Sequence, residues 1–317
     1  MMRVLIVGAG ATGGYFGGRL LQAGCDVTFL VRARRMKQLG ETGLRITSPF
    51  GDVTIDQPPI VLASNIASPF DPVLVSCKAY DLTEVMQSFA AAVGSSTAIL
   101  PVLNGMSHID ALAARFGADR ILGGLCMISS TLDEIGTVVH LNRVHGITFG
   151  ELDGRNSDRV EAIAALLSRG AFDSDATPTI LHAMWEKWTF IAGLAGITSL
   201  MRGSIGDIMA AGGERLAIGL YEECSAIANG AGYGPREVAA ARSRQFLSTR
   251  GSPLVASMLK DVERGSRTEA DHILGDLLRR RRAGEDSMGI APGTTSLLEV
   301  AHAALMTYEA RRAGQER

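Results

Sequence analysis

The spacing of apolar residues near the start of the chain changes twice. Arg3-Val4-Leu5-Ile6-Val7 is a short aliphatic run, and Val27-Thr28-Phe29-Leu30-Val31 is a second one. Between them the apolar residues recur at helical spacing, and Gly24 stands where a helix C-cap is expected. The helical stripe consists of Tyr15, Phe16, Leu20 and Leu21. The pattern predicts a strand, a helix and a second strand over the first 32 residues.

Further apolar runs extend this α/β pattern to about residue 174. Buried strands are predicted at 73–77, 97–103 and 121–127, and helices at 82–92 and 158–167. Residues 44–47 and 53–55 alternate and predict a peripheral surface hairpin, while 137–140 and 146–149 predict an antiparallel pair that closes the sheet. The expected fold of residues 1–174 is a wound α/β domain built on a parallel sheet.

From about Asp175 only helical periods remain. They cover 178–201, 214–229, 235–247, 255–264, 268–282 and 294–311. The sequence therefore predicts an all-helical second domain over residues 175–317. A length of 317 residues agrees with two domains, since single cores seldom grow beyond roughly 250–300 residues.

A glycine motif follows the first predicted strand without a gap. Gly8-Ala9-Gly10-Ala11-Thr12-Gly13 fits G-x-G-x-x-G. In such a turn Gly8 allows the tight bend, Gly10 lets the backbone approach a pyrophosphate, and Gly13 lets helix and strand pack closely. In a chain with 37 glycines the alternative is an ordinary strand-to-helix turn. The position between a strand and a helix favours the nucleotide site, where helical N–H groups hold the phosphates. We therefore expect residues 1–174 to form a Rossmann-type dinucleotide-binding domain.

The end of the second strand indicates which dinucleotide is bound. An NAD site usually has Asp or Glu there for the ribose hydroxyls, whereas Val31 is followed by Arg32-Ala33-Arg34-Arg35. Arginine cannot accept a hydrogen bond from a 2′-hydroxyl but can clamp a 2′-phosphate. We therefore expect NADPH as the cofactor, with Arg32 as the first candidate. Which of the three arginines contacts the phosphate stays open, because one or more can simply be solvated.

Composition narrows the function class. Hydrophobic residues make up 46% of the chain and charged residues 20%, with a formal net charge of −2, so no basic field favours nucleic acid or a membrane surface. No apolar run reaches the ~18 residues of a membrane span, and a strand starting at residue 3 does not suit a signal peptide. Four scattered cysteines, Cys25, Cys77, Cys126 and Cys224, predict reduced thiols and no metal site. We expect a cytoplasmic protein with a small-molecule substrate.

Polar residues follow two of the predicted parallel strands. Lys78 comes after the strand at 73–77 and Asn104 after the strand at 97–103. Ligands bind beyond the carboxyl ends of such strands, so both residues are candidates for cofactor or substrate contacts. A solvated lysine and an ordinary Asn-Gly turn are the alternatives. His108, His140 and His145 show no ligand spacing and are expected to be structural or surface residues.

Lys187 is the candidate for proton transfer. It lies in Trp185-Glu186-Lys187-Trp188 within the longest predicted helix, among apolar neighbours. Desolvation lowers the pKa of such a lysine, which can then act as an acid near neutral pH. A snorkelling or salt-bridged lysine is the alternative.

Taken together, these features resemble the 2-dehydropantoate 2-reductases, the ketopantoate reductase family. The resemblance spans nearly the whole chain and rests on the glycine motif, Arg32, Lys78, Asn104-Gly105-Met106, Trp185-Glu186-Lys187, and Ser257-Met258-Leu259-Lys260-Asp261 followed by Arg267-Thr268-Glu269. It implies NADPH-dependent reduction of a 2-oxo acid to a 2-hydroxy acid, with ketopantoate, and so pantothenate and coenzyme A biosynthesis, as the first expectation. The resemblance and the domain pattern lead us to expect an active site formed by both domains.

The resemblance also implies residue roles. Lys187 matches the catalytic lysine that protonates the substrate carbonyl oxygen, and Glu269 matches an acid near cofactor and substrate. Ser257 matches a substrate-contacting serine, Asn104 an asparagine where nicotinamide and substrate meet, and Lys78 a lysine near the cofactor. For Glu269 and Ser257 the alternative is a residue favoured at a helix start.

One departure from the family pattern affects the substrate. The family typically has Asn four and eight residues after the lysine, and this chain has Ile191 and Ala195 there. Both lie on the lysine's face of the helix, where Thr198 is the nearest polar residue. Without these amides a substrate hydroxyl is not bound in the usual way, so the exact 2-oxo acid stays open.

Two alternatives therefore accompany the leading function. One is a related reductase with a more apolar 2-oxo acid, and the other is a non-catalytic NADP(H)-binding sensor or interaction protein. Retention of Lys187 and Glu269 argues against the sensor. The expected partners are a small 2-oxo acid and, as a candidate assembly, a second copy of the chain.

Overall fold

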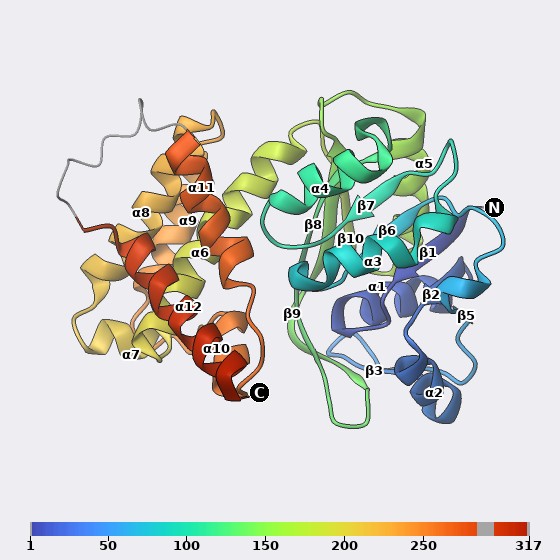
Figure 1. Cartoon of the computed structure of the whole chain (residues 1–317), viewed down its shortest axis with the longest axis horizontal. Coiled ribbons are helices and arrows are strands. Elements are labelled where there is room, and N and C mark those ends of the chain that lie inside the picture. The colour runs from blue at the N-terminus through green and yellow to red at the C-terminus, as the bar shows by residue number, and fades with distance from the viewer. Residues whose placement is uncertain (1, 284–294, 316–317) are drawn as a thin grey trace. The chain divides into compact units, whose positions relative to one another are not determined.

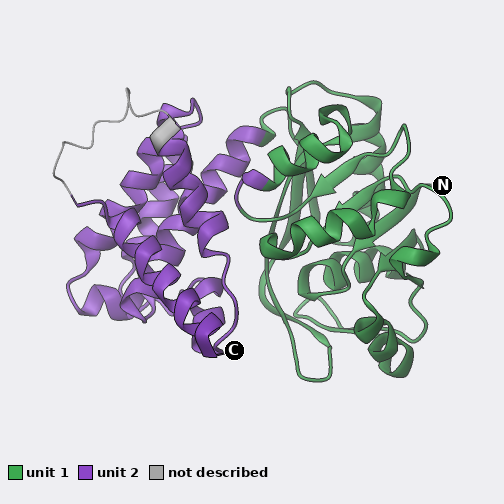
Figure 2. Cartoon of the chain, in the orientation of Figure 1, with its two compact units in different colours: residues 1–104, 108–180 green, residues 105–107, 181–317 purple. Residues whose placement is uncertain are grey.

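The computed structural model describes residues 2–283 and 295–315 and divides the chain into two compact units, shown in green and purple in Figure 2. Unit 1 consists of Met1–Asn104 and His108–Ile180, and unit 2 of Gly105–Ser107 and Leu181–Arg317. This division follows contacts within the chain. The domain ranges 1–174 and 175–317 remain predictions.

A parallel sheet forms the first half of unit 1 (Figure 1). Its strands lie in the order β5-β2-β1-β6-β7, and each neighbouring pair is parallel. They are β1 (Arg3–Val7), β2 (Asp26–Leu30), β5 (Ile60–Val61), β6 (Val73–Val75) and β7 (Ile99–Pro101). The connecting helices are α1 (Ala11–Gln22), α2 (Ala33–Thr42) and α3 (Leu82–Ser88), with α4 (Ser107–Phe116) after β7. The predicted wound sheet is confirmed, while α2 and α4 were not predicted.

A second sheet in unit 1 corrects two predictions. It has the order β10-β9-β3-β4, with β8 (Leu122–Leu132) also paired to β9 (Val138–Glu151). The segments 137–140 and 146–149 are therefore not an antiparallel pair, because residues 138–140 and 146–149 lie in the same strand, β9. Nor do they close the parallel sheet. The residues between them, of which Leu141, Arg143 and Val144 are exposed and His145 is buried, continue one long strand and do not form a turn.

The predicted hairpin is real but is not peripheral. It consists of β3 (Leu44–Thr47) and β4 (Val53–Ile55), which pair antiparallel. However, β3 also pairs in parallel with β9, and Leu44 and Ile46 are fully buried. The hairpin is thus part of the second sheet. After β9 the chain forms the helix α5 (Asp158–Leu167) and then β10 (Asp173–Ala176), which pairs in parallel with β9.

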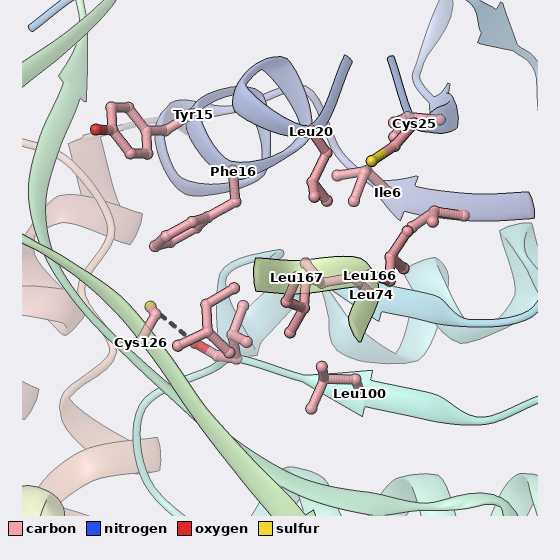
Figure 3. Packing of buried hydrophobic residues seen from close by; sticks show 14 of the residues in the cluster. Ile6, Tyr15, Phe16, Leu20, Cys25, Leu74, Leu100, Cys126, Leu166 and Leu167 are labelled. Atoms are coloured by element: carbon pink, nitrogen blue, oxygen red, sulfur yellow. Dashed lines mark hydrogen bonds between the residues drawn. The ribbon is translucent and has the colours of Figure 1, made fainter. Parts of the chain in front are cut away.

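Helix α1 packs against both sheets through glycines. A Cβ on Gly17 would lie 2.5 Å from Phe29 of the parallel sheet, and one on Gly18 would lie 2.6 Å from Ile46 of the second sheet. Figure 3 shows Tyr15, Phe16 and Leu20 of this helix near residues from several strands and α5. The core of unit 1 therefore fixes the start of α1, which follows the glycine motif.

Several sequence-based expectations about polar core residues are confirmed. Cys25, Cys126 and Cys224 are buried, Cys77 is half-buried, and none of the four forms a disulfide. His140 and His145 are buried structural residues: Tyr15 Oη lies 2.6 Å from His145 Nδ1, and Ser48 Oγ lies 3.0 Å from His140 Nδ1. His108 is fully buried.

Unit 2 is all-helical in its described part, as predicted (Figure 1). Its helices are α6 (Ile180–Met201), α7 (Ile205–Ala210), α8 (Glu214–Gly230), α9 (Glu237–Ser248), α10 (Ser257–Glu263), α11 (Asp276–Ala283) and α12 (Leu297–Gln315). Helix α7 was not predicted, although Ser204 and Asp207 form a capping box at its start. The predicted helix 268–282 is a π turn, Asp271–Gly275, followed by α11, and Thr294 of the last predicted helix lies outside the described residues. Among the described helices none has the length and hydropathy needed to cross a bilayer.

Candidate functional site

The glycine motif forms a tight turn between β1 and α1. Gly8 has φ +96°, in the left-handed region, and its N–H donates to Leu30 O of β2 at 2.9 Å. A Cβ on Gly13 would lie 2.1 Å from Gly8 O and 2.4 Å from Ser76 Oγ. The structural roles predicted for Gly8 and Gly13, bending and close packing, are therefore confirmed.

Gly10 differs from these two glycines because nothing lies within 4 Å of the Cβ it would carry. Gly10 is also the N-cap of α1, which has no side-chain cap hydrogen bond and no acid in its first turn. The N–H groups of Ala11 and Thr12 thus begin a twelve-residue helix beside open space. A helix start with these properties suits an anion, so the turn fits the pyrophosphate of a dinucleotide.

Four candidate segments leave the parallel sheet at the same edge. The glycine motif follows β1, Arg32 follows β2, Lys78 follows β6 and Asn104 follows β7. Since all these strands are parallel and adjacent, their carboxyl ends share one edge. Lys78 and Asn104 are half-buried there. The structure of unit 1 therefore brings the predicted cofactor residues of this unit to one edge, with Ala9 buried beneath them.

Arg32 lies at this edge with carboxylates as partners. Its side chain is 59% exposed, and its Nη2 lies 3.0 Å from Glu84 Oε2 and 3.5 Å from Asp81 Oδ2. Exposed pairs of this kind contribute only ~0–1 kcal/mol, so a phosphate can compete for the guanidinium. The sequence analysis did not identify Asp81 and Glu84 as partners of Arg32. The available signal was their position just before and within the first turn of α3.

The other two arginines are placed differently. Arg34 is exposed, whereas Arg35 Nε donates to Ala9 O inside the glycine motif at 2.9 Å. Burial lowers the pKa of Arg35, and Asp133 partly opposes this change. Arg35 thus supports the turn itself, whereas Arg32 and Arg34 are exposed just after β2.

Lys187 lies on α6, and the residues on either side of it in the sequence anchor this helix. Trp185 and Trp188 are buried, and Glu186 accepts three hydrogen bonds from Arg236, from its N, Nε and Nη2, at 2.9, 2.8 and 2.6 Å. Burial alone would raise the pKa of Glu186, but the hydrogen bonds from Arg236 hold it below its ordinary value. Glu186 is therefore an ionised anchor of the helix, and Lys187 is half-buried beside it.

The residues that follow Lys187 on its face are apolar or already bonded. Ile191 is half-buried and Ala195 is buried. Thr198 is fully buried, and its Oγ1 donates to Leu194 O at 2.7 Å and accepts from Ala256 N at 3.4 Å. Thr198 was predicted as a substrate contact, but its hydroxyl is engaged with the backbone. We expect it to act through Ala256, which caps the helix of Ser257.

The remaining candidates of unit 2 lie on two segments. Ser257 is exposed in the first turn of α10, and Glu269 is half-buried before the π turn. Thr268 anchors the second segment, because its N–H and Oγ1 donate to Glu309 Oε1 at 2.6 and 2.7 Å. The candidate residues thus fall into two groups, the nucleotide-binding ones in unit 1 and Lys187, Glu269 and Ser257 in unit 2.

Comparison with known families follows this division. The family model "Ketopantoate reductase PanE/ApbA" matches residues 4–154, and "Ketopantoate reductase PanE/ApbA C terminal" matches residues 179–304. The chain belongs to the ketopantoate reductase family. It is therefore an oxidoreductase, and the expected architecture of this family is the one observed, a parallel-sheet N-terminal part and a helical C-terminal part.

Individual relatives of this reductase agree. An uncharacterized oxidoreductase of Bacillus subtilis, YkpB, is 35% identical, covering 98% of this chain and 100% of the relative. The crystal structure of 2-dehydropantoate 2-reductase from Geobacter metallireducens has a TM-score of 0.85 at 30% identity, covering 96% and 99% of the two chains. A D-mandelate dehydrogenase solved with NADH and anilino(oxo)acetate has a TM-score of 0.84 at 21% identity, covering 98% and 100%. This last likeness shows the fold alone.

Metal ligands are not gathered in the part of this reductase that the structure describes. No group of three or more His, Cys, Asp or Glu side chains among the described residues could hold a metal ion.

Proposed function

We propose that this ketopantoate reductase family member reduces a 2-oxo acid to a 2-hydroxy acid with NADPH, and that ketopantoate is the first substrate to test. The family match across both parts of the chain carries this proposal, together with Lys187 and Glu269 at the positions that resemble the family's catalytic residues. The activity would place the protein in pantothenate and coenzyme A biosynthesis.

In the proposed reaction Lys187 is the general acid. When bound, NADPH supplies the hydride that the carbonyl carbon of the substrate accepts. The Lys187 ammonium gives its proton to the carbonyl oxygen, so that the product carries a neutral hydroxyl group. Glu269 organises the substrate, while Ser257 and Asn104 provide hydroxyl and amide groups for it.

For the cofactor we propose that the first N–H groups of α1 hold the pyrophosphate and that Arg32 binds the 2′-phosphate. The open space at Gly10 and the exposed guanidinium of Arg32 support this assignment. Lys78, at the same edge of the sheet, adds a positive charge for the dinucleotide. Glu269 contributes to the cofactor site as well as to the substrate site.

The substrate is the open part of the proposal. Ile191 and Ala195 give an apolar wall where the family typically has amides, and Thr198 is already bonded. An apolar wall accepts a ligand with or without a hydroxyl at a difference of only ~1–3 kcal/mol. This favours, as a second candidate function, reduction of a more apolar 2-oxo acid.

Steady-state turnover with NADPH over a panel of 2-oxo acids tests the proposal. The panel contains ketopantoate, its analogue without the hydroxyl, and branched aliphatic and aromatic 2-oxo acids. We expect turnover, with ketopantoate preferred over the analogue by less than ~10²-fold in kcat/KM. A preference for ketopantoate above ~10⁴-fold would refute the idea that an apolar wall replaces the amides. Tight NADPH binding without any turnover would favour a non-catalytic sensor.

A further inference from the structure

The segment after Glu269 has an unusual backbone. Residues Asp271–Gly275 form a π turn that continues directly into α11. A Cβ on Gly275, the last residue of the turn, would lie 2.3 Å from Asp271 Oδ1, so the absence of a side chain there leaves room for the Asp271 carboxylate. Single π turns within helices displace backbone groups from their usual partners and occur frequently at functional sites.

Trp188 of α6 provides a hydrogen bond to this turn. Its indole Nε1–H donates to Ile273 O at 2.9 Å, and both residues are buried, with exposed fractions of 1% and 3%. A buried indole N–H without an acceptor would be destabilising, so the bond fixes the ring and the turn together. Lys187 is the residue directly before this tryptophan.

The same residue, Ile273, is also linked to Glu269. The N–H of Ile273 donates to Glu269 O at 2.9 Å. Two hydrogen bonds, from the Trp188 side chain to Ile273 O and from Ile273 N to Glu269 O, thus link the residue next to Lys187 with the backbone of Glu269. Both bonds lie within unit 2.

Other contacts hold the turn on its remaining sides. Arg279 donates to Asp271 Oδ1 at 2.9 Å and to Asp271 O at 3.1 Å. His272 Nδ1 lies 2.9 Å from Ser107 Oγ, which also belongs to unit 2. The turn is therefore fixed at three successive residues, and Trp188 provides its link to the helix of Lys187.

We propose that Trp188 is a positioning residue, whose indole N–H sets the spacing between Lys187 and Glu269 through the π turn. The inference rests on the proposed function, because it assigns a task to the distance between these two residues. Displacement of a reacting group by ~1 Å can cost ~10²-fold in rate. The bond should therefore affect the chemical step more than cofactor binding.

Trp188→Phe tests the proposal, with Trp185→Phe as the matched control. Both substitutions remove an indole from a buried site on α6, but Trp185 packs by ring contacts, stacked on Tyr233 at 5.9 Å and tilted against Trp188. We expect W188F to lower kcat by ~10- to 100-fold and to shift the pH profile of kcat, with an unchanged KM for NADPH. W185F should leave the pH profile in place, although both variants lose some thermal stability.

Hydrogen exchange of the peptide spanning residues 269–275, followed by mass spectrometry, provides a readout that does not need turnover. Exchange should be faster in W188F than in W185F at matched stability. The proposal would be overturned if exchange in W188F were no faster than in W185F. It would also be overturned if exchange were faster in W188F but its kcat and pH profile matched those of W185F. If the unaltered protein turns over no 2-oxo acid, the proposed function fails, and the exchange comparison alone decides whether Trp188 fixes the segment of Glu269.

Discussion

Gly10 and Gly13 lie three residues apart in the glycine motif, and the structure predicts opposite outcomes when each is changed to alanine. At Gly13 the new Cβ would lie 2.1 Å from a backbone oxygen, Gly8 O, and 2.4 Å from Ser76 Oγ. Neither β1 nor α1 can move away without breaking the packing of the core. Overpacking costs ~1–3 kcal/mol and more against backbone, so we expect Gly13→Ala to lose at least ~3 kcal/mol of unfolding free energy.

At Gly10 the Cβ would enter open space, and φ −81° with ψ −163° is extended backbone that alanine adopts. Removing glycine flexibility stabilises by ~0.4–1 kcal/mol, while alanine is a poorer N-cap than glycine by a similar amount. These effects nearly cancel. A methyl group in the space proposed for the pyrophosphate should instead weaken NADPH binding at least ~tenfold, which is ~1.4 kcal/mol.

Urea unfolding and NADPH titration by calorimetry measure the two effects separately. Ser76→Ala in the Gly13→Ala background removes one of the two clashes, so it should recover only part of the lost stability. If Gly10→Ala binds NADPH as tightly as the unaltered protein, the motif does not hold the pyrophosphate. Wild-type stability of Gly13→Ala would refute the close packing of β1 and α1.

The other predictions concern charge and proton transfer. We expect NADPH to bind at least ~tenfold more tightly than NADH. Arg32→Ala should remove most of this preference, and Glu84→Gln should increase it by up to ~5-fold. Titration of each variant with both cofactors measures these effects. Lys187→Ala should lower turnover ~10²–10⁴-fold with nearly unchanged NADPH affinity and stability, and loss of folding instead would show a structural lysine. Burial lowers the pKa of His145 below 6.5, and the charges of His140 and Arg19 lower it further, while Asp173 partly opposes them. As the pH falls, His145 is therefore protonated in the unfolded chain before it is protonated in the folded protein. Stability should therefore be full above pH ~6.5 and fall below it, and urea unfolding at pH ~7.5 and ~5.5 should show a smaller loss for His145→Gln.

The elements that sequence predicts best are those whose pattern is local. The β1-α1-β2 unit was predicted because its apolar period and its glycines lie within 32 consecutive residues. The helices of unit 2 were predicted for the same reason, apart from the short α7. The capping box of α7 was a usable signal, although six residues are too few for a clear helical period.

The second sheet could not be predicted because its pairings are non-local. β3 joins β9 through Ile46 and Val138, residues far apart in the chain, and no feature of either strand names its partner. In β9, Leu141 and Val144 are exposed apolar residues between the two segments taken as separate strands. The alternation of apolar and polar residues therefore predicted that these segments form strands, but it predicted neither the length of the strand nor the sheet to which it belongs.

The candidate site shows the same limit in its chemistry. Arg32, Lys187 and Glu269 are marked by residue type and by a resemblance, but their surroundings depend on the fold. The sequence gives no sign that Arg32 faces Glu84, 52 positions later, and a buried tryptophan such as Trp188 is expected simply as core. What distinguishes Trp188 is an acceptor 85 positions away, Ile273 O, in a turn whose π geometry no hydrophobic period specifies. Residue type thus identifies which groups can react, whereas the contacts that fix their positions have to come from the structure.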